Sequence, residues 1–279
     1  MNRREVLLHA SQLLSEHHIQ DADWEAEVLL RDTLKIDRVH LYTDPEHMVT
    51  PRQEAAFWEK VDRRIGGEPS AYIIGHREFY GLDFAVGSDV LIPRPETELL
   101  VDRAIELARD LPHPIIADIG TGCGAIAVSI ALNIPAAHVY AIDISAAALE
   151  VAKENCRKHN VIKAITLING ELVKALPEPV DIIVANLPYV KTSDVSSVNT
   201  NGYEPRLALD GGKDGLNVIR KLCQQAGDML KPGGTMLLEI GMGQGEQVRT
   251  LLQEKFPGCR VNVTTDYAKI ERLVSVTLP

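Results

Sequence analysis

The spacing of apolar residues divides the chain into two parts. From residue 1 to about residue 72, apolar positions recur at intervals of three and four without strand-like alternation, a period that predicts amphipathic helices. Asp21 and Asp23 are candidate N-caps of the second helix, and Thr50-Pro51 opens a third. We therefore expect a small helical bundle over residues 1–72.

A short segment with a different pattern follows the bundle. The run Tyr72-Ile73-Ile74-Gly75 leads into alternating residues around Gly81, which predict a β-hairpin. We expect residues 73–94 to be a hairpin linker that joins the two parts of the chain.

Helices and strands alternate from residue 95 to the end. The predicted helices cover residues 96–109, 125–132, a segment opened by Ser145 as N-cap, 216–230 and 247–255. The predicted strands cover residues 115–119, 139–144, 165–168, 181–185, 235–240, 260–264 and 273–278. Such alternation predicts an α/β fold with a mostly parallel sheet covered on both faces. The last two strands have no helix between them, so we expect them to be antiparallel.

Charge and cysteine content narrow the class of protein. The 279 residues include 29 Lys and Arg against 39 Asp and Glu, a net charge of −10, which disfavours a protein that grips a long nucleic-acid backbone. The sequence has no apolar run of membrane-spanning length and no secretory signal. The four cysteines form no CxxC pair and no metal-binding spacing with histidine. We expect buried thiols in a reducing compartment, the cytoplasm, and no metal site.

A glycine-rich turn follows the predicted strand 115–119 and opens the next helix. Its residues are Gly120, Thr121, Gly122, Cys123 and Gly124. Glycine lets the backbone turn sharply and approach a ligand closely. Asp143, at the end of the next strand, can accept hydrogen bonds from both hydroxyls of a ribose. Together they predict a cofactor containing adenosine, although the glycine spacing alone fits NAD as well as S-adenosylmethionine.

The tetrapeptide Asn186-Leu187-Pro188-Tyr189 follows the buried strand 181–185 and should lie at the same sheet edge. Pro188 favours an extended Leu187, so the Leu187 carbonyl can lie beside the Asn186 side-chain oxygen. Two neighbouring acceptors suit an NH2 group, and Tyr189 offers a flat face for a planar amide or base. We therefore predict Asn186 and Tyr189 as catalytic residues of methyl transfer from S-adenosylmethionine to nitrogen.

Several longer stretches resemble the HemK/PrmC family, the peptide chain release factor glutamine methyltransferases. The matching stretches are Gly75 with residues 78–82, residues 91–98, the glycine turn, Asp143, residues 186–189 and residues 203–212. Residues 92–98 and 203–206 are the specific part, since many methyltransferases share the glycine turn. The resemblance implies a class I, Rossmann-like methyltransferase domain over residues 95–279. It also implies that the helical domain helps to dock the release factor.

The resemblance further implies a substrate and roles for the site residues. The substrate is the glutamine of the release factor's Gly-Gly-Gln loop, bound by Asn186, Leu187, Pro188 and Tyr189. S-adenosylmethionine is bound by Gly120 to Gly124, Asp143 and Asn186, with Glu171 placed where related enzymes contact the adenine. Arg94 and Glu98 either line the site or pair with each other. Residues 210–212 and 231–234 are expected to be turns.

Two alternatives remain open at this point. Leu187 replaces the first proline usual in the family, and Asn-Leu-Pro-Tyr also occurs in ribosomal RNA adenine dimethyltransferases, so an RNA or DNA adenine amino methyltransferase is the main alternative. The net charge, residues 92–98 and the N-terminal position of the helical domain weigh against it. A non-catalytic cofactor-binding module is the weaker alternative, because it would leave Asn186 and Tyr189 without a role.

Overall fold

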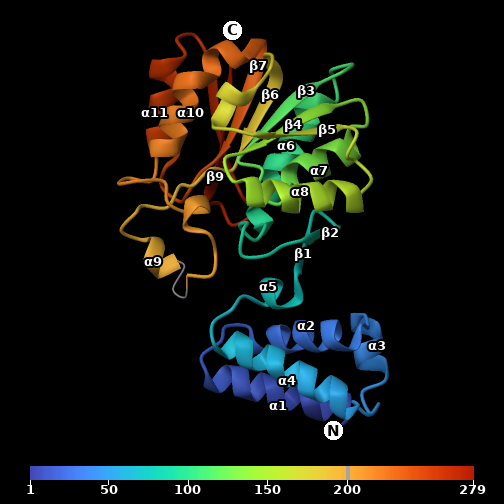
Figure 1. The fold of residues 1–279 in the computed structure, drawn as a ribbon. Helices are drawn as coiled ribbons and strands as arrows, with labels where there is room; N and C mark the ends of the chain where they lie inside the picture. The colour runs from blue at the N-terminus through green and yellow to red at the C-terminus, as the bar shows by residue number, and fades with distance from the viewer. Residues whose placement is uncertain (199–201) are drawn as a thin grey trace. The chain divides into compact units, whose positions relative to one another are not determined.

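The computed structural model describes residues 1–198 and 202–279 (Figure 1). The chain forms two compact units, Met1–His76 and Arg77–Pro279. The boundary lies within the first strand of the predicted hairpin, so the helical unit extends past residue 72.

The first unit is built from helices, as the sequence predicts. These are α1 (Arg3–Glu16), α2 (Ala22–Leu34), α3 (Arg38–Thr43), α4 (Pro51–Ile65) and α5 (Ser70–Ile74). The apolar positions of α1, α2 and α4 meet in one core, in which Leu14, Leu30 and Phe57 are fully buried. Burial of this shared apolar face stabilises helices that would be marginal in isolation.

Two of the predicted helix starts differ in their capping. At Thr50 the hydroxyl accepts a hydrogen bond from the Gln53 backbone at 3.3 Å, and the Gln53 side chain accepts one from the Thr50 backbone at 3.1 Å. Asp21 occupies the N-cap position of α2, but its side chain makes no capping bond. Its backbone is left-handed, with φ 52°, whereas side-chain capping requires an extended backbone. Asp23 lies inside the first turn.

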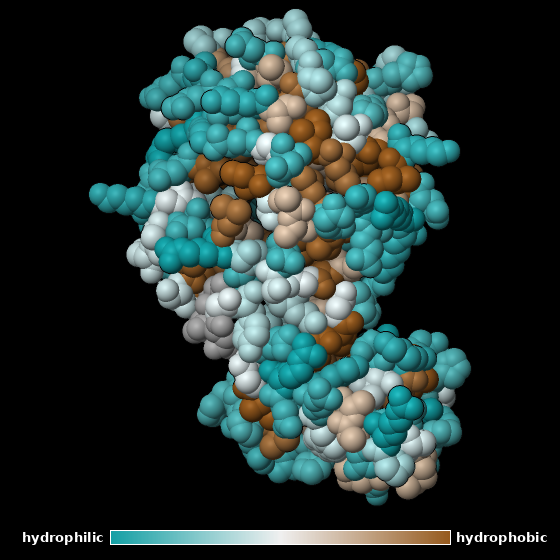
Figure 2. All heavy atoms as spheres, in the orientation of Figure 1, coloured by the Kyte–Doolittle hydropathy of each residue, from teal (hydrophilic) through white to brown (hydrophobic). Residues whose placement is uncertain are grey.

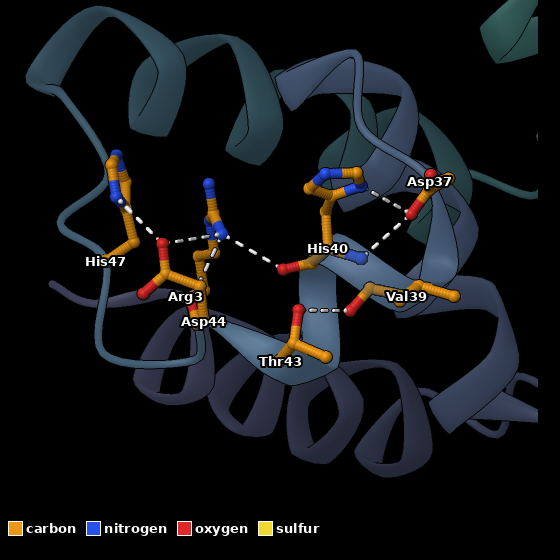
Figure 3. A network of polar contacts seen from close by, with 7 residues as sticks. All are labelled: Arg3, Asp37, Val39, His40, Thr43, Asp44 and His47. Atoms are coloured by element: carbon orange, nitrogen blue, oxygen red, sulfur yellow. Dashed lines mark hydrogen bonds and ion pairs between the residues drawn. The ribbon is translucent and has the colours of Figure 1, made fainter.

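Local hydrogen bonds stabilise the short helix α3, which the apolar period does not predict. Asp37 caps its start by accepting from the backbone of His40 at 2.8 Å. Arg3 of α1 donates through Nη1 to the carbonyl oxygens of His40 and Asp44, at 3.1 Å each (Figure 3). A helix of six residues is too short to show a hydrophobic period, so only its cap could have indicated it.

The run Tyr72-Ile73-Ile74 forms part of α5 and not the start of the hairpin, so this part of the sequence interpretation is wrong. A run this short has no readable period, and Gly75, with φ 82°, ends the helix in the left-handed conformation. The hairpin itself is confirmed in β1 (His76–Phe79) and β2 (Leu82–Ala85). Its two turn residues, Tyr80 and Gly81, both have positive φ, as the tight hairpin turn requires.

A seven-stranded sheet forms the centre of the second unit (Figure 1). In spatial order its strands are β5 (Ile165–Asn169), β4 (His138–Asp143), β3 (Ile115–Ile119), β6 (Val180–Ala185), β7 (Leu230–Glu239), β9 (Glu271–Thr277) and β8 (Arg260–Thr265). The first five are mutually parallel, and β9 is antiparallel to both β7 and β8. The predicted mostly parallel sheet and its antiparallel final pair are confirmed.

Helices cover both faces of this sheet (Figure 1). One face carries α6 (Glu98–Ala108), α7 (Ala125–Asn133) and α8 (Ala146–Lys158), and the other carries α10 (Asn217–Ala226) and α11 (Gly245–Lys255). The shorter elements are η1 (Pro95–Thr97), η2 (Leu172–Ala175), α9 (Val195–Val198), η3 (Arg206–Ala208) and η4 (Gly227–Met229). In the described part of the chain, no helix is long and apolar enough to cross a membrane.

The predicted turn at residues 231–234 is a bulge inside β7. Val180 of β6 pairs with Leu230, and Ile182 pairs with Thr235. Residues 231–234 of β7 therefore lie opposite a single residue of β6. Gly233 in the bulge has φ 75°, which favours glycine. The turn residues therefore interrupt the pairing without ending the strand.

The strand order brings the predicted motifs together. The chain runs from β3 outward through β4 and β5 and then returns to β6 on the other side of β3. Such a switch point opens a crevice at the carboxyl ends of the strands. Ile119 pairs with Ile142 on one side and with Ala185 on the other. Gly120 therefore lies at the edge position between Asp143 and Asn186.

The side chain of Asn155, on α8, forms hydrogen bonds with both the hairpin and the glycine turn. This side chain is fully buried: Oδ1 accepts from the Ala85 backbone at 2.8 Å, and Nδ2 donates to the carbonyls of Ala85 and Cys123 at 3.0 and 2.8 Å. We expect Asn155→Ala to lower the free energy of unfolding by roughly 2–4 kcal/mol, because three buried or partly buried backbone groups lose their partner. Urea unfolding measures this, with the exposed Asn133→Ala as the control, and equal midpoints for the two variants would contradict it.

Candidate active site

A cavity of about 390 Å³ lies at the carboxyl ends of the central strands. It is lined by most of the predicted site residues: Gly120, Thr121, Gly122, Cys123, Asp143, Glu171, Asn186, Leu187 and Pro188. Of the predicted residues, all of which are described, Gly124 and Tyr189 do not line it. Ile144 and Leu207 also line it and are 55% and 60% exposed. Figure 2 shows hydrophobic residues, in brown, among the hydrophilic ones on the visible surface of the larger unit.

The glycine turn is stabilised by hydrogen bonds from its own backbone. The amides of Gly120 and Thr121 both donate to the carbonyl of Ile142, at 2.8 and 3.0 Å. Beneath the turn, Asp118 Oδ2 accepts from the Thr121 hydroxyl at 2.6 Å and from the Ala127 amide at 3.1 Å. Complete burial raises the pKa of Asp118 to about 7. The turn is therefore positioned by its own residues and by its neighbouring strand.

Each glycine of the turn has a different spatial requirement. A Cβ at Gly120 would lie 3.1 Å from the Leu187 side chain, so glycine here permits close packing against the β6 turn. A Cβ at Gly124 would lie 3.2 Å from the Cβ of Ala152 in α8. At Gly122, which has φ 55°, a Cβ would meet nothing within 4 Å. Gly122 thus leaves bare backbone beside open space, where a ligand can approach.

Asp143 presents a carboxylate to the cavity. Its Oδ2 accepts from the Gly122 amide and its Oδ1 from the Ser145 amide, both at 2.9 Å. Each oxygen retains further lone-pair capacity, so the group can accept two adjacent hydroxyls. Ser145 also caps α8, as predicted, by accepting from the Ala148 amide at 3.2 Å. The donor and acceptor set around Gly122 and Asp143 fits the ribose of an adenosine-containing cofactor.

Glu171 lies at the exposed side of the cavity and forms an ion pair with Lys221 of α10. The hydrogen bond from Lys221 lowers the pKa of Glu171. Because both side chains line the cavity, a ligand here would meet the pair and not an isolated carboxylate. The role of Glu171 toward the adenine stays a prediction.

Asn186 and Leu187 line the cavity and each carries an acceptor without a described partner. The Asn186 Nδ2 donates to the hydroxyl of Thr97 at 3.0 Å. Neither the Asn186 Oδ1 nor the Leu187 carbonyl oxygen has a hydrogen-bond partner among the described residues. The Leu187 side chain is buried and belongs to the hydrophobic core of the sheet. Both residues line the cavity, and the joint binding of one NH2 group by their two oxygens stays a prediction.

Tyr189 is directed toward the end of β7. Its hydroxyl donates to Glu239 Oε1 at 3.3 Å. Burial raises the pKa of Tyr189 and raises that of Glu239 to about 7. The predicted stacking of the Tyr189 ring on a planar substrate stays a prediction, and Glu239 is a neighbour of the site that sequence reasoning missed.

Arg94 lines the cavity and pairs with Glu204, not with Glu98. Its Nη2 donates to Glu204 Oε2 at 2.6 Å, while the Ile92 amide donates to Oε1 at 3.1 Å. Glu98 instead accepts from the Tyr80 amide at 2.8 Å. Of the two roles left open for Arg94, lining the site is confirmed and the pair with Glu98 is wrong. The sequence stretches 92–98 and 203–206 therefore meet beside the cavity.

The glycines of the segment 210–215 pack closely against the tetrapeptide. A Cβ at Gly211 would lie 2.6 Å from the Pro188 carbonyl oxygen, and one at Gly215 would lie 2.3 Å from that of Tyr189. Both distances are far below van der Waals contact. Gly211, in the predicted turn 210–212, and Gly215 beyond it thus also support the backbone that carries Asn186.

We expect Gly215→Ala to displace this backbone. The variant should lose about 1–3 kcal/mol more unfolding free energy than Gly243→Ala, and the rate of the predicted methyl transfer should fall at least about 10-fold, since small misplacements are costly. Gly243 is the matched control because it has a similar φ of 80° with nothing within 4 Å. Thermal unfolding and single-turnover rates measure the two effects, and indistinguishable variants would contradict the packing role.

The strand order, the glycine turn at the switch point and the acceptors after β6 define a class I methyltransferase. Family models agree: residues 5–75 match the PrmC N-terminal domain, and residues 96–201 match the methyltransferase small domain. A ribosomal protein L11 methylase from Lactobacillus delbrueckii subsp. bulgaricus has a similar fold, with TM-score 0.51 and 21% identity, covering 68% of this chain and 82% of that one.

Curated relatives are named release factor glutamine methyltransferase. The one from Moorella thermoacetica is 41% identical over 274 residues, which cover 98% of this chain and 97% of the relative. The one from Bacillus anthracis is 36% identical over 280 residues, with 97% of each chain covered. The chain belongs to the release factor glutamine methyltransferase family.

Proposed function

We propose that this protein transfers a methyl group from S-adenosylmethionine to the side-chain amide nitrogen of the glutamine in the Gly-Gly-Gln loop of peptide chain release factors. The observation that carries the proposal is the orientation of Asn186, whose NH2 end donates to Thr97 and whose Oδ1 is without a partner among the described residues. An oxygen at this point of the cavity suits the NH2 group of a substrate amide. The names of the relatives support the same substrate.

The residues present fit the proposed cofactor. The glycine turn, Gly120 to Gly124, would hold it beside the bare backbone of Gly122, and the Asp143 carboxylate would accept the ribose hydroxyls. Glu171 would lie toward the adenine. S-adenosylmethionine supplies, when bound, a methyl group activated by its sulfonium.

Asn186 and Leu187 orient and polarise the weakly nucleophilic amide nitrogen. If the Asn186 Oδ1 and the Leu187 carbonyl each accept one N–H hydrogen, the amide is held by both hydrogens and its nitrogen faces one direction. Fixed acceptors that draw on these hydrogens also stabilise the positive charge that develops on the nitrogen. Pro188 would restrict the turn, and placement supplies most of the catalysis.

The proposal also gives the helical unit a role in binding the release factor and places the protein in the cytoplasm. We infer that Met1–His76, which includes the match to the PrmC N-terminal domain, helps to dock the release factor. The protein would act in the cytoplasm, which agrees with four cysteines that are free thiols. Nucleic acid is not expected as a direct substrate of a chain with net charge −10.

Transfer of labelled methyl groups tests the proposal. The purified protein is incubated with methyl-labelled S-adenosylmethionine and with release factor, release factor whose loop glutamine is replaced by alanine, or ribosomal RNA. We expect label on the intact factor alone. Label on adenine would support the nucleic-acid alternative, and cofactor binding without transfer to any of the three would support a non-catalytic module.

A further inference from the structure

We propose that Thr97 and Glu239 act as a positioning pair that determines which end of the Asn186 amide faces the cavity. The inference rests on the proposed function, in which the Asn186 oxygen receives the substrate amide. Neither residue is required to touch the substrate: both act through Asn186.

Thr97 makes the direct contact with Asn186. It ends the short helix η1, is only 4% exposed, and receives the hydrogen bond from Asn186 Nδ2 at 3.0 Å. A hydroxyl can either donate or accept, and an amide has a donor at one end and an acceptor at the other. This contact alone would therefore allow the Asn186 amide in both orientations.

Glu239 removes that ambiguity. It ends β7 and is 3% exposed. Because Ala185 pairs with Leu238, Asn186 and Glu239 occupy adjacent positions at the sheet edge. Its Oε1 accepts from Tyr189, while its Oε2 makes no close hydrogen bond within the described residues. A hydrogen-bonding effect of the Thr97 side chain favours the charged form of Glu239 and lowers its pKa, against burial, which raises it.

A carboxylate can only accept hydrogen bonds. When Glu239 is charged, the single proton of the Thr97 hydroxyl is directed to it, and Thr97 has only lone pairs to offer to Asn186. The NH2 end of Asn186 must then face Thr97, and Oδ1 must face away from it. In a flipped amide, Asn186 Oδ1 would face the Thr97 oxygen, which has no proton left to donate. Two acceptors would then meet without a hydrogen bond, which is unfavourable in a buried place.

Protonation of Glu239 should allow both orientations of the Asn186 amide. A neutral carboxyl can donate to Thr97, which frees the Thr97 proton for Asn186 Oδ1 and permits the flipped amide. Burial raises the pKa of Glu239 to about 7, so the productive orientation should lose population as the pH falls through this value. The ionisable groups that act on Glu239 or its partner Tyr189 are Glu96, Arg94 and Arg272.

Substitutions at Thr97 test the direct contact. Thr97→Val keeps the shape of the side chain and removes the hydroxyl, while Thr97→Ser keeps the hydroxyl. We expect Thr97→Val to lower kcat about 10- to 100-fold, with KM for the release factor and Kd for S-adenosylmethionine within about twofold of wild type. Thr97→Ser should restore most of the rate. Thr235→Val, at a buried threonine in the middle of β7 whose hydroxyl pairs with that of Thr277, is the control for losing a threonine hydroxyl.

Glu239→Gln tests the second member of the pair. The wild-type kcat should fall below an apparent pKa of about 7, and this acid limb should be absent from Glu239→Gln. A readout without turnover is the side-chain NH2 resonance of Asn186, assigned by its loss in Asn186→Ala. We expect this resonance to titrate with the same midpoint in the wild type and not in Glu239→Gln.

The outcomes separate this inference from the proposed function. If the wild type methylates the release factor but folded Thr97→Val has wild-type kcat, the positioning pair is overturned. An Asn186 resonance that does not respond to pH also overturns it, and does so even if Thr97→Val fails to fold. If the wild type transfers no methyl group to the factor, the proposed function fails, and the resonance titration decides the positioning pair by itself.

Discussion

Asn186→Ala is expected to lower the rate of methyl transfer to the release factor about 100- to 1000-fold, the usual effect of removing one preorganised polar contact from the reacting group. The variant lacks the Oδ1 acceptor beside the cavity and the hydrogen bond to Thr97. The substrate amide would keep only the Leu187 carbonyl and could rotate about it. Single-turnover transfer of labelled methyl, with cofactor and factor both saturating, measures the effect on the chemical step.

The control for this variant is Asn262→Ala, an exposed asparagine in β8, which should keep the wild-type rate. Affinity for S-adenosylmethionine should change much less than the rate in Asn186→Ala, because the glycine turn and Asp143 remain. Unaltered turnover in a folded Asn186→Ala protein would remove this residue from the mechanism.

Asp143→Ala should weaken S-adenosylmethionine binding by roughly 100-fold or more. Hydrogen bonds to a charged group contribute roughly 1.5–3 kcal/mol each, and about 1.4 kcal/mol corresponds to a tenfold change in Kd. The substitution removes the acceptor for the ribose hydroxyls and also for the amides of Gly122 and Ser145. Isothermal titration calorimetry gives Kd directly, without the release factor.

Asp110→Ala is the matched control, since Asp110 is exposed and lies outside the cavity. Its Kd should equal that of the wild type. If Asp143→Ala retained a Kd within about twofold of wild type, the carboxylate would not be the ribose contact, and the proposed placement of the cofactor would have to change.

The fold was predictable where a segment carries a clear period or a clear boundary signal. The helices α1, α2 and α4 and the strands of the parallel sheet were found because their apolar positions repeat. The helices α3 and α5 were missed because each has at most six residues. The sequence predicts a turn where the structure has the bulge at Gly233, since a glycine with positive φ occurs in both and only strand pairing distinguishes them.

The candidate site was predictable where functional residues directly follow strands. Gly120, Asp143 and Asn186 come after three neighbouring strands, and parallel strands end at one edge. Thr97 and Glu239 were missed, although Thr97 lies in the specific stretch 92–98 and Glu239 lies in the predicted strand 235–240. Their importance depends on a hydrogen bond across 89 positions of the chain, between Asn186 and Thr97, which no local pattern contains.

The amino-acid order alone was sufficient to assign the α/β class and to place the glycine turn and the tetrapeptide 186–189 directly after their strands, because backbone preferences and apolar periods act over a few neighbouring residues. Folding in three dimensions decided which partner each polar group meets: Arg94 with Glu204, Tyr189 with Glu239, and Asn186 with Thr97. The partners in these three contacts lie 110, 50 and 89 positions apart in the chain, so only the folded structure could bring them together, where polar groups removed from water need hydrogen-bond partners.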